Sequence, residues 1–208
     1  MVLQTPCLTL RPFTEKDIDL IAHYCNDPEV SRNTATIPFP YPREKAESFF
    51  LYTQNKNQNG GGVVVGIVWK ETDTLCGCIE LGRNNEEQKY NRAELGYWIG
   101  RDFWGRGIAT EAGLAMLSFG FDDLKLHKIT SCYYNFNVGS ERVQKKLGFK
   151  IEGVLRDQIE REGHYFALIK TGLLVSEFHG IASKEEVSGL SSLKEKTPSF
   201  LSKPYRTA

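Results

Sequence analysis

The sequence predicts an α/β domain built on one sheet of mixed strand direction with few helices. At two places in the sequence, a pair of apolar, strand-like runs flanks a polar segment, which is typical of neighbouring antiparallel strands. Once, a strand is followed by a glycine-rich loop, an apolar helix and another strand, which is typical of a parallel crossover. The runs are residues 63–69 with 74–81, 149–155 with 164–175 across the loop 156–163, and 92–99 with 128–134.

The remaining elements follow from the same kinds of pattern. Residues 7–11 alternate apolar and polar side chains, as a half-buried strand does, and Pro12 ends the run. Thr14 precedes a helix whose apolar residues recur at helical spacing, and Pro28 stops it. We further expect a helix over residues 43–58, a solvated loop over 84–89 and a short helix from about residue 140 to 147.

Length, composition and charge limit the possible classes of protein. The chain has 208 residues, which suits one domain with a real core, and from residue 180 the composition shifts to Ser, Lys, Glu and Pro. We therefore predict a single domain over 1–179 and a flexible tail over 180–208. Lys plus Arg and Asp plus Glu both number 26, so no global field favours nucleic acid or a membrane. No leader or membrane span is recognisable, and we predict a cytoplasmic monomer or homodimer.

The cysteines and histidines do not form a metal-binding pattern. Five cysteines are an odd number, and the closest pair, Cys76 and Cys78, is CxC without a second pair to complete a tetrahedral site. The four histidines show no ligand spacing either. We predict reduced, buried thiols and no metal.

The stretch 102–112, DFWGRGIATEA, is the strongest local motif. Gly105 and Gly107 allow sharp turns and a close backbone approach to a ligand, and the helix that follows presents unpaired N–H groups and a positive partial charge. Together these features predict an anion cradle, with phosphate as the commonest guest. The pattern is neither GxGxxG nor GxxxxGK[ST], and alone it is equally compatible with a tight turn ahead of a helix.

Three ordered segments resemble the GCN5-related N-acetyltransferase (GNAT) family, in particular its RimJ/RimL-like branch of ribosomal-protein N-terminal acetyltransferases. They are LTLRPFTEKD with NDPEV, AELGYWIGRDFWGRGIATEA, and NVGSERVQKKLGFKIEGVLRD. The resemblance covers roughly residues 8–178. It implies a largely antiparallel sheet with one splayed parallel pair, and transfer of acetyl from acetyl-CoA to an amine.

The resemblance also implies roles for particular residues. Backbone groups of Trp98 and Ile99 would pair with the pantetheine arm between the splayed strands, and Asn137 would bond it near the thioester. Trp104 stands where the broad family often has Arg or Gln, and the branch tolerates Trp there. Backbone amides would hold the pyrophosphate at Gly105, Arg106, Gly107, Ile108, Ala109 and Thr110.

The transfer requires a base for the amine, stabilisation of the carbonyl oxygen and of the departing thiolate, and close positioning. For the base we select Glu94, because a half-buried carboxylate in an apolar strand has a raised pKa. The alternative is an outward Glu94 paired with Arg92 or Arg83. For the thiolate we select Ser140, whose alternative role is that of a helix N-cap.

The sequence departs from the family at two places and leaves the acceptor open. Gln144 stands where a tyrosine often protonates the thiolate, and Ala167 where the branch usually has Asp. The resemblance implies a protein N-terminal amine as acceptor. The alternatives are a small amine, such as a polyamine, an amino acid or an antibiotic, and a non-catalytic coenzyme A sensor. The aromatic, Pro-rich segment 37–42 is a candidate wall of the acceptor site.

Overall fold

A computed structural model describes residues 1–161 and 163–180 of the chain. The chain divides into two compact units, Met1–Phe178 and His179–Ala208, and the fold described below is that of the first unit. Of the expected tail, residues 181–208 lie outside the described part, so the division at residue 179/180 stays a prediction.

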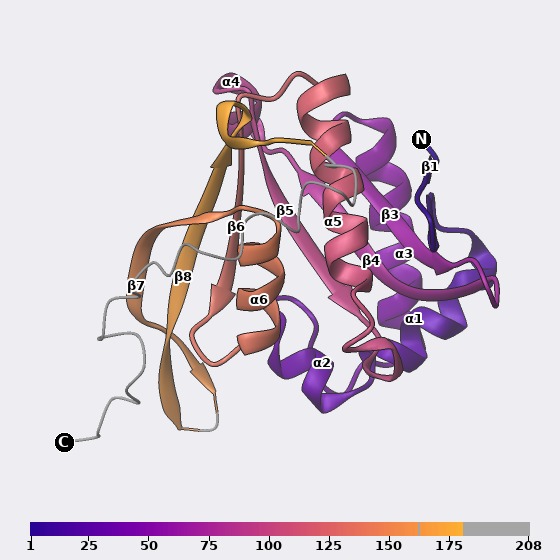
Figure 1. The fold of residues 1–208 in the computed structure, drawn as a ribbon. Coiled ribbons are helices and arrows are strands. Elements are labelled where there is room, and N and C mark those ends of the chain that lie inside the picture. Colours follow the sequence, from indigo (N-terminus) through magenta and orange to yellow (C-terminus); the bar gives the residue numbers. More distant parts are fainter. Residues whose placement is uncertain (162, 181–208) are drawn as a thin grey trace. The chain divides into compact units, whose positions relative to one another are not determined.

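The described strands form one eight-stranded sheet in the order β1-β2-β3-β4-β5-β6-β8-β7 (Figure 1). All neighbours are antiparallel except β5 and β6, which run parallel across the predicted crossover. This mixed sheet with one parallel pair confirms the predicted fold class. The strands are β1 (Leu3–Gln4), β2 (Leu8–Arg11), β3 (Gly62–Trp69), β4 (Thr74–Gly82), β5 (Arg92–Ile99), β6 (Lys128–Tyr134), β7 (Lys150–Arg161) and β8 (His164–Leu174).

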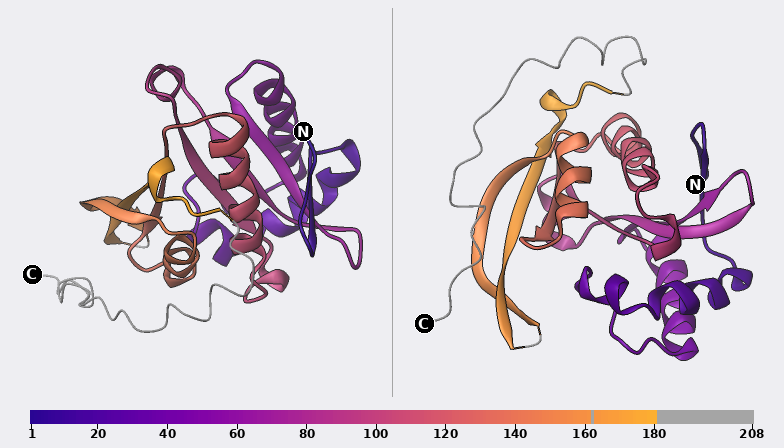
Figure 2. Two further views of the ribbon diagram at one scale, coloured as in Figure 1. Left: turned by 45° about the horizontal axis from the view of Figure 1, so that its top comes forward. Right: turned by 60° about the horizontal axis from the view of Figure 1, so that its bottom comes forward.

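Helices cover both faces of the sheet. The right-hand view of Figure 2 shows α5 and α6 on one face, and α1, α2 and α3 on the other. A π-helical turn, Phe119–Asp123, continues α5 toward β6. The α-helices are α1 (Ile18–Cys25), α2 (Pro28–Arg32), α3 (Arg43–Gln58), α4 (Asn85–Lys89), α5 (Ile108–Ser118) and α6 (Val138–Lys146).

Two hydrophobic cores follow from this arrangement, because alternate side chains of each strand point to opposite faces. On one face Ile79 and Leu95 pack with Met116 of α5. On the other face Trp98 and Cys78 pack with Ile21 of α1. The central strands are therefore buried on both sides, which explains why their sequences are almost continuously apolar.

Two local expectations are wrong, and one short helix was not predicted. The first helix ends before Pro28 as expected, but Pro28 also occupies the first turn of α2, which Asp27 caps through the amides of Glu29 and Val30. Residues 84–89 are not merely a solvated loop, because Asn84 caps the short helix α4. The expected polar loop 156–163 is largely strand, because β7 continues to Arg161 as an exposed edge strand.

Within the part of the chain that the structure describes, no helix combines the length and the apolar character that crossing a membrane requires.

Candidate active site

The parallel strands β5 and β6 separate part of the way along the sheet. Their pairing ends at Glu94 with Thr130, and just beyond it the Ser131 hydroxyl donates to the Leu95 carbonyl at 2.8 Å. On its other side β5 stays paired with β4 to Ile99. An opening therefore forms in the sheet beside the second half of β5, where the resemblance predicted the splayed pair.

The register decides which backbone groups of β5 face this opening. The Gly100 amide donates to the Cys76 carbonyl of β4 at 2.9 Å, and hydrogen-bonding sides alternate along a strand. The backbone of Trp98 therefore faces β4, whereas those of Tyr97 and Ile99 face the opening. Of the two residues expected to pair with pantetheine, Ile99 has the required orientation, and Tyr97 has it in place of Trp98.

The glycine loop has the backbone geometry of a cradle. Gly105 and Gly107 have φ values of +77° and +80°, which L-residues with side chains rarely adopt. Gly107 is the N-cap of α5, and its carbonyl accepts from the amides of Thr110 and Glu111 at 3.0 Å each. The amides of Ile108 and Ala109 precede the first intrahelical bonds, so they are available to an anion.

The side chains of Trp104 and Arg106 make contacts on either side of the glycine loop. The Trp104 indole N–H donates to the Ile99 carbonyl at 2.7 Å, which fixes the end of β5 beside the loop. The Arg106 guanidinium lies 5.8 Å from the ring centroids of both Trp69 and Phe103. Arg106 thus provides positive charge beside the cradle, held over two aromatic rings.

The start of α6 differs from the expectation in one respect. Asn137, not Ser140, is the N-cap, because Asn137 Oδ1 accepts from the Ser140 amide at 3.0 Å. Asn137 Nδ2 donates to the Asn33 carbonyl beyond α2 at 3.3 Å. The capping alternative for Ser140 is therefore wrong, and its hydroxyl is left for other contacts.

The Ser140 hydroxyl contacts side chains from two other parts of the sequence. Ser140 Oγ lies 2.8 Å from the Tyr97 hydroxyl and 3.3 Å from Gln144 Nε2. Gln144 Oε1 in turn accepts from the Thr171 hydroxyl of β8 at 2.6 Å. Burial raises the pKa of Tyr97, and the hydrogen bonds with Ser140 and Gln144 only partly oppose it. No local pattern in the sequence predicts the contact between Tyr97 and Ser140.

Glu94 is exposed, so the prediction that it is half-buried is wrong, and the argument from burial no longer applies to it. Neither predicted ion pair, with Arg92 or with Arg83, is recorded for it in the described chain, where Arg92 pairs with Glu86. The Cys132 thiol of β6 lies 3.6 Å from Glu94 Oε1. The carboxylate thus stands where the two strands begin to separate.

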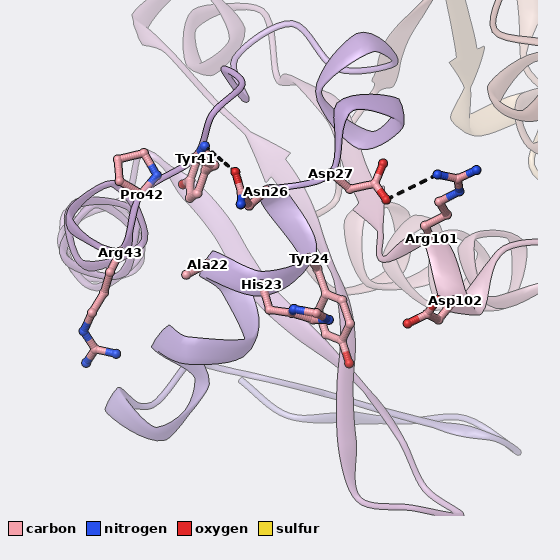
Figure 3. Close-up of a pocket in the computed structure, with 10 residues that line it drawn as sticks. All are labelled: Ala22, His23, Tyr24, Asn26, Asp27, Tyr41, Pro42, Arg43, Arg101 and Asp102. Carbon is pink, nitrogen blue, oxygen red and sulfur yellow. Dashed lines mark hydrogen bonds and ion pairs between the residues drawn. The ribbon is translucent and has the colours of Figure 1, made fainter.

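A pocket of about 550 Å³ opens beside the segment that leads into the glycine loop (Figure 3). The amide of Tyr41, from the Pro-rich segment, donates to Asn26 Oδ1 at 2.8 Å. The Arg101 guanidinium lies 3.7 Å from the Asp27 carboxylate. The lining residues are Ala22, His23, Tyr24, Asn26, Asp27, Tyr41, Pro42, Arg43, Arg101 and Asp102.

The mixed sheet, the opening beside β5 and the glycine loop ahead of α5 together suit an acyltransferase that holds a thioester of coenzyme A. The comparison with known families leads to the same class of protein. The Acetyltransferase (GNAT) domain matches residues 8–150. The chain belongs to the GNAT family of N-acetyltransferases.

The names of individual relatives indicate two kinds of acceptor, ribosomal protein and spermidine. The "Uncharacterized N-acetyltransferase p20" of Bacillus licheniformis is 33% identical over 178 residues, covering 86% of this chain and 98% of its own. The "Putative ribosomal N-acetyltransferase YdaF" of Bacillus subtilis is 34% identical over 119 residues, covering 57% and 63%. The spermidine N(1)-acetyltransferase of Escherichia coli is 24% identical over 156 residues, covering 75% and 80%.

Solved structures share the fold. A GNAT-family acetyltransferase from Bacillus anthracis superimposes with a TM-score of 0.72 at 25% identity, covering 85% of this chain and all of that chain.

Acetyl-CoA is the co-substrate of this family, and the residues present fit it. The amides that precede the first bonds of α5 suit a pyrophosphate, and the opening beside β5 offers backbone groups to an extended arm. The thioester supplies an activated acetyl group when bound. Within residues 1–161 and 163–180, no three His, Cys, Asp or Glu side chains gather in a way that would hold a metal ion.

Proposed function

We propose that this N-acetyltransferase acetylates the N-terminal amine of a protein, by direct attack of the amine on the thioester while both are bound. In this proposal the glycine loop from Gly105 to Thr110 binds the pyrophosphate through its backbone amides. Ile99 and Tyr97 pair with the pantetheine arm, and Asn137 lies near its thioester end. Glu94 accepts the proton of the amine, directly or through a water, and Ser140 stabilises the departing thiolate.

The observation that carries the proposal is the placement of Glu94 and Ser140 on opposite faces of the sheet. Glu94 shares a face with Trp98, which packs in the core of α1 and α3. Ser140 contacts Tyr97, which packs against the core of α5 on the other face. A base on one face and a thiolate stabiliser on the other suit direct attack. The amine can add to the carbonyl carbon from the face of Glu94, and the sulfur then leaves beside Ser140 when the tetrahedral intermediate collapses.

Two observations favour a peptide over a polyamine. The name of YdaF, a relative at 34% identity, describes a ribosomal N-acetyltransferase. A polyamine site needs free carboxylates, and of the two aspartates that line the pocket, Asp27 and Asp102, the first already caps α2 and pairs with Arg101. The spermidine acetyltransferase among the relatives keeps a small amine as the second candidate.

The test is release of free thiol from acetyl-CoA with a panel of N-terminal peptides, spermidine and amino acids, with mass spectrometry to locate the acetyl group. Glu94→Gln is compared with Glu44→Gln, which changes an exposed carboxylate on α3. We expect peptide N-termini to be the best acceptors. We expect Glu94→Gln to lower kcat about 100-fold or more, while acetyl-CoA still binds in calorimetry.

Two outcomes would overturn the proposal in different parts. Faster turnover with spermidine than with every peptide would assign the chain to small amines. Equal rates for Glu94→Gln and Glu44→Gln with the best acceptor would remove Glu94 from the reaction and leave the acceptor assignment intact.

A further inference from the structure

A chain of polar side chains links β8 to the opening beside β5 through the first two turns of α6. It runs from Thr171 through Gln144 to Ser140 and ends at the Tyr97 hydroxyl, with contacts of 2.6, 3.3 and 2.8 Å. Gln144 is only 1% exposed and Thr171 only 3% exposed. Polar groups so deeply buried are retained in a fold when their hydrogen bonds are made, as they are here.

The contacts of Gln144 determine the orientation of its amide. Nε2 lies 3.0 Å from the carbonyl oxygen of Cys132, which can only accept, so Nε2 and not Oε1 must face it. The second proton of Nε2 then points to Ser140 Oγ, and Oε1 accepts from Thr171. Nε2 thus faces Cys132 on one side and Ser140 and Tyr97 on the other, and Gln144 must act on Ser140 as a donor.

A hydroxyl group has one proton to donate and two lone pairs to accept with. Ser140 Oγ accepts from Gln144 with one lone pair. The phenol of Tyr97 is protonated at neutral pH, and at 2.8 Å either oxygen could be the donor, so Tyr97 can donate to the second lone pair. In that arrangement the proton of Ser140 has no acceptor within the chain of side chains and is left for a ligand in the opening that Tyr97 borders.

We propose that Tyr97 and Gln144 are positioning residues, which occupy both lone pairs of Ser140 so that its proton points to the sulfur of the bound thioester. This inference rests on the proposed role of Ser140 and extends it to two residues that do not touch the reacting atoms. It also accounts for the departure at Gln144: where the family often has a tyrosine, this chain has an amide, and β5 supplies the phenol instead.

The reaction balances without a proton leaving Ser140. The amine nitrogen forms a bond to the carbonyl carbon, the carbon–sulfur bond breaks, and its electron pair goes to sulfur. The base takes the proton from the nitrogen, so the products are an amide, a thiolate and the protonated base. Ser140 donates a hydrogen bond to the sulfur as its charge develops, and the two hydrogen bonds that it accepts make it a stronger donor.

Tyr97→Phe tests this role with little change in packing, because only the hydroxyl is removed. Tyr52→Phe is the matched control, because it removes a hydrogen-bonded hydroxyl from α3. We expect Tyr97→Phe to lower kcat about three- to tenfold with an unchanged KM for acetyl-CoA, and Ser140→Ala to lower it more. In the Ser140→Ala background, Tyr97→Phe should have no further effect.

A second readout needs no acceptor, so it separates this inference from the acceptor assignment. The thiol of coenzyme A bound to the protein is titrated through the ultraviolet absorbance of its thiolate. Wild type and Tyr52→Phe should ionise it at lower pH than Tyr97→Phe, Gln144→Leu or Ser140→Ala. Identical thiol titrations in wild type and Tyr97→Phe, or equal rate losses from Tyr97→Phe with and without Ser140, would overturn the proposal. A larger loss from Tyr97→Phe than from Ser140→Ala would also overturn it, because the phenol itself would then be the donor.

Discussion

Replacing Gly107 by alanine tests whether the cradle depends on a left-handed backbone. Gly107 has φ +80° and ψ −1°, and a Cβ built there would meet no atom within 4 Å. The cost of Gly107→Ala is therefore conformational and not steric, about 1–2 kcal/mol for an L-residue in this region. For a chain of this length that corresponds to a fall in melting temperature of roughly 2–8 °C.

The functional effect follows from the same geometry. If the loop relaxes to relieve the strain, the amides that precede the first bonds of α5 turn away from the position of the pyrophosphate. Calorimetry should then show weaker binding of acetyl-CoA, and thermal unfolding should show the lower melting temperature. Gly153→Ala is the control, because Gly153 also has open space around its Cβ but lacks a positive φ. Equal melting temperatures and equal acetyl-CoA affinities for the two variants would refute the reasoning.

Three other predictions concern the fold. Asp17 pairs with Arg11; burial raises the carboxyl pKa, but the hydrogen bonds from Arg11 and Thr14 outweigh this and lower the pKa below its usual value. The pair therefore stabilises the fold above about pH 4, and this stabilisation is lost as the pH falls through the lowered pKa. In urea unfolding, Asp17→Asn should lower the free energy of unfolding by about 2 kcal/mol at pH 7 and by much less at pH 2. A Cβ on Gly77 would lie 2.5 Å from the Trp98 carbonyl oxygen, so Gly77→Ala should destabilise the fold by about 1–3 kcal/mol in the same assay. An aromatic disulfide reagent at pH 7 should modify the exposed Cys7 first, and rapid reaction of any second thiol in the native protein would contradict the structure. Burial raises the pKa of the other thiols, to about 12 for Cys25 and Cys76, to about 11 for Cys132 and well above the usual value for Cys78.

The sheet could be predicted from the sequence because its central strands are buried on both faces and leave long apolar runs. Of the edge strand β7, the first half was predicted as the run 149–155. Its continuation to Arg161 was not, because most of its side chains are exposed and carry no periodic pattern. Two short helices were missed although local signals were present. Asn84 with Glu87 forms a capping box for α4, and Asp27 before Pro28 is a start signal for α2.

The candidate site divides in the same way. The sharp turns of the glycine loop could be predicted, because glycine adopts a positive φ more readily than other residues and Gly105 and Gly107 stand in the sequence. Binding of an anion by this loop stays a prediction. The sequence alone does not identify the N-cap of α6, because Asn137 and Ser140 are both good capping residues. The structure shows that Asn137 is the N-cap. The contact between Tyr97 and Ser140 joins residues 43 positions apart, and no local rule predicts it.

This division explains why the co-substrate is easier to infer than the acceptor. In the proposed site, amides and carbonyls of the backbone bind pyrophosphate and pantetheine, and their placement follows from the break between β5 and β6 and from the start of α5. Recognition of an acceptor depends on side chains, and these come from segments that lie far apart in the sequence, as in the pocket lined by residues 22–27, 41–43 and 101–102. Asn33 and Thr34 beyond α2 illustrate this, because they are held by Asn137 and Arg161 from the far half of the chain. Enzymes that share a glycine loop of this kind can therefore differ in their acceptors. The acceptor of this chain has to be found by measuring thiol release with different amines, because the motifs do not specify it.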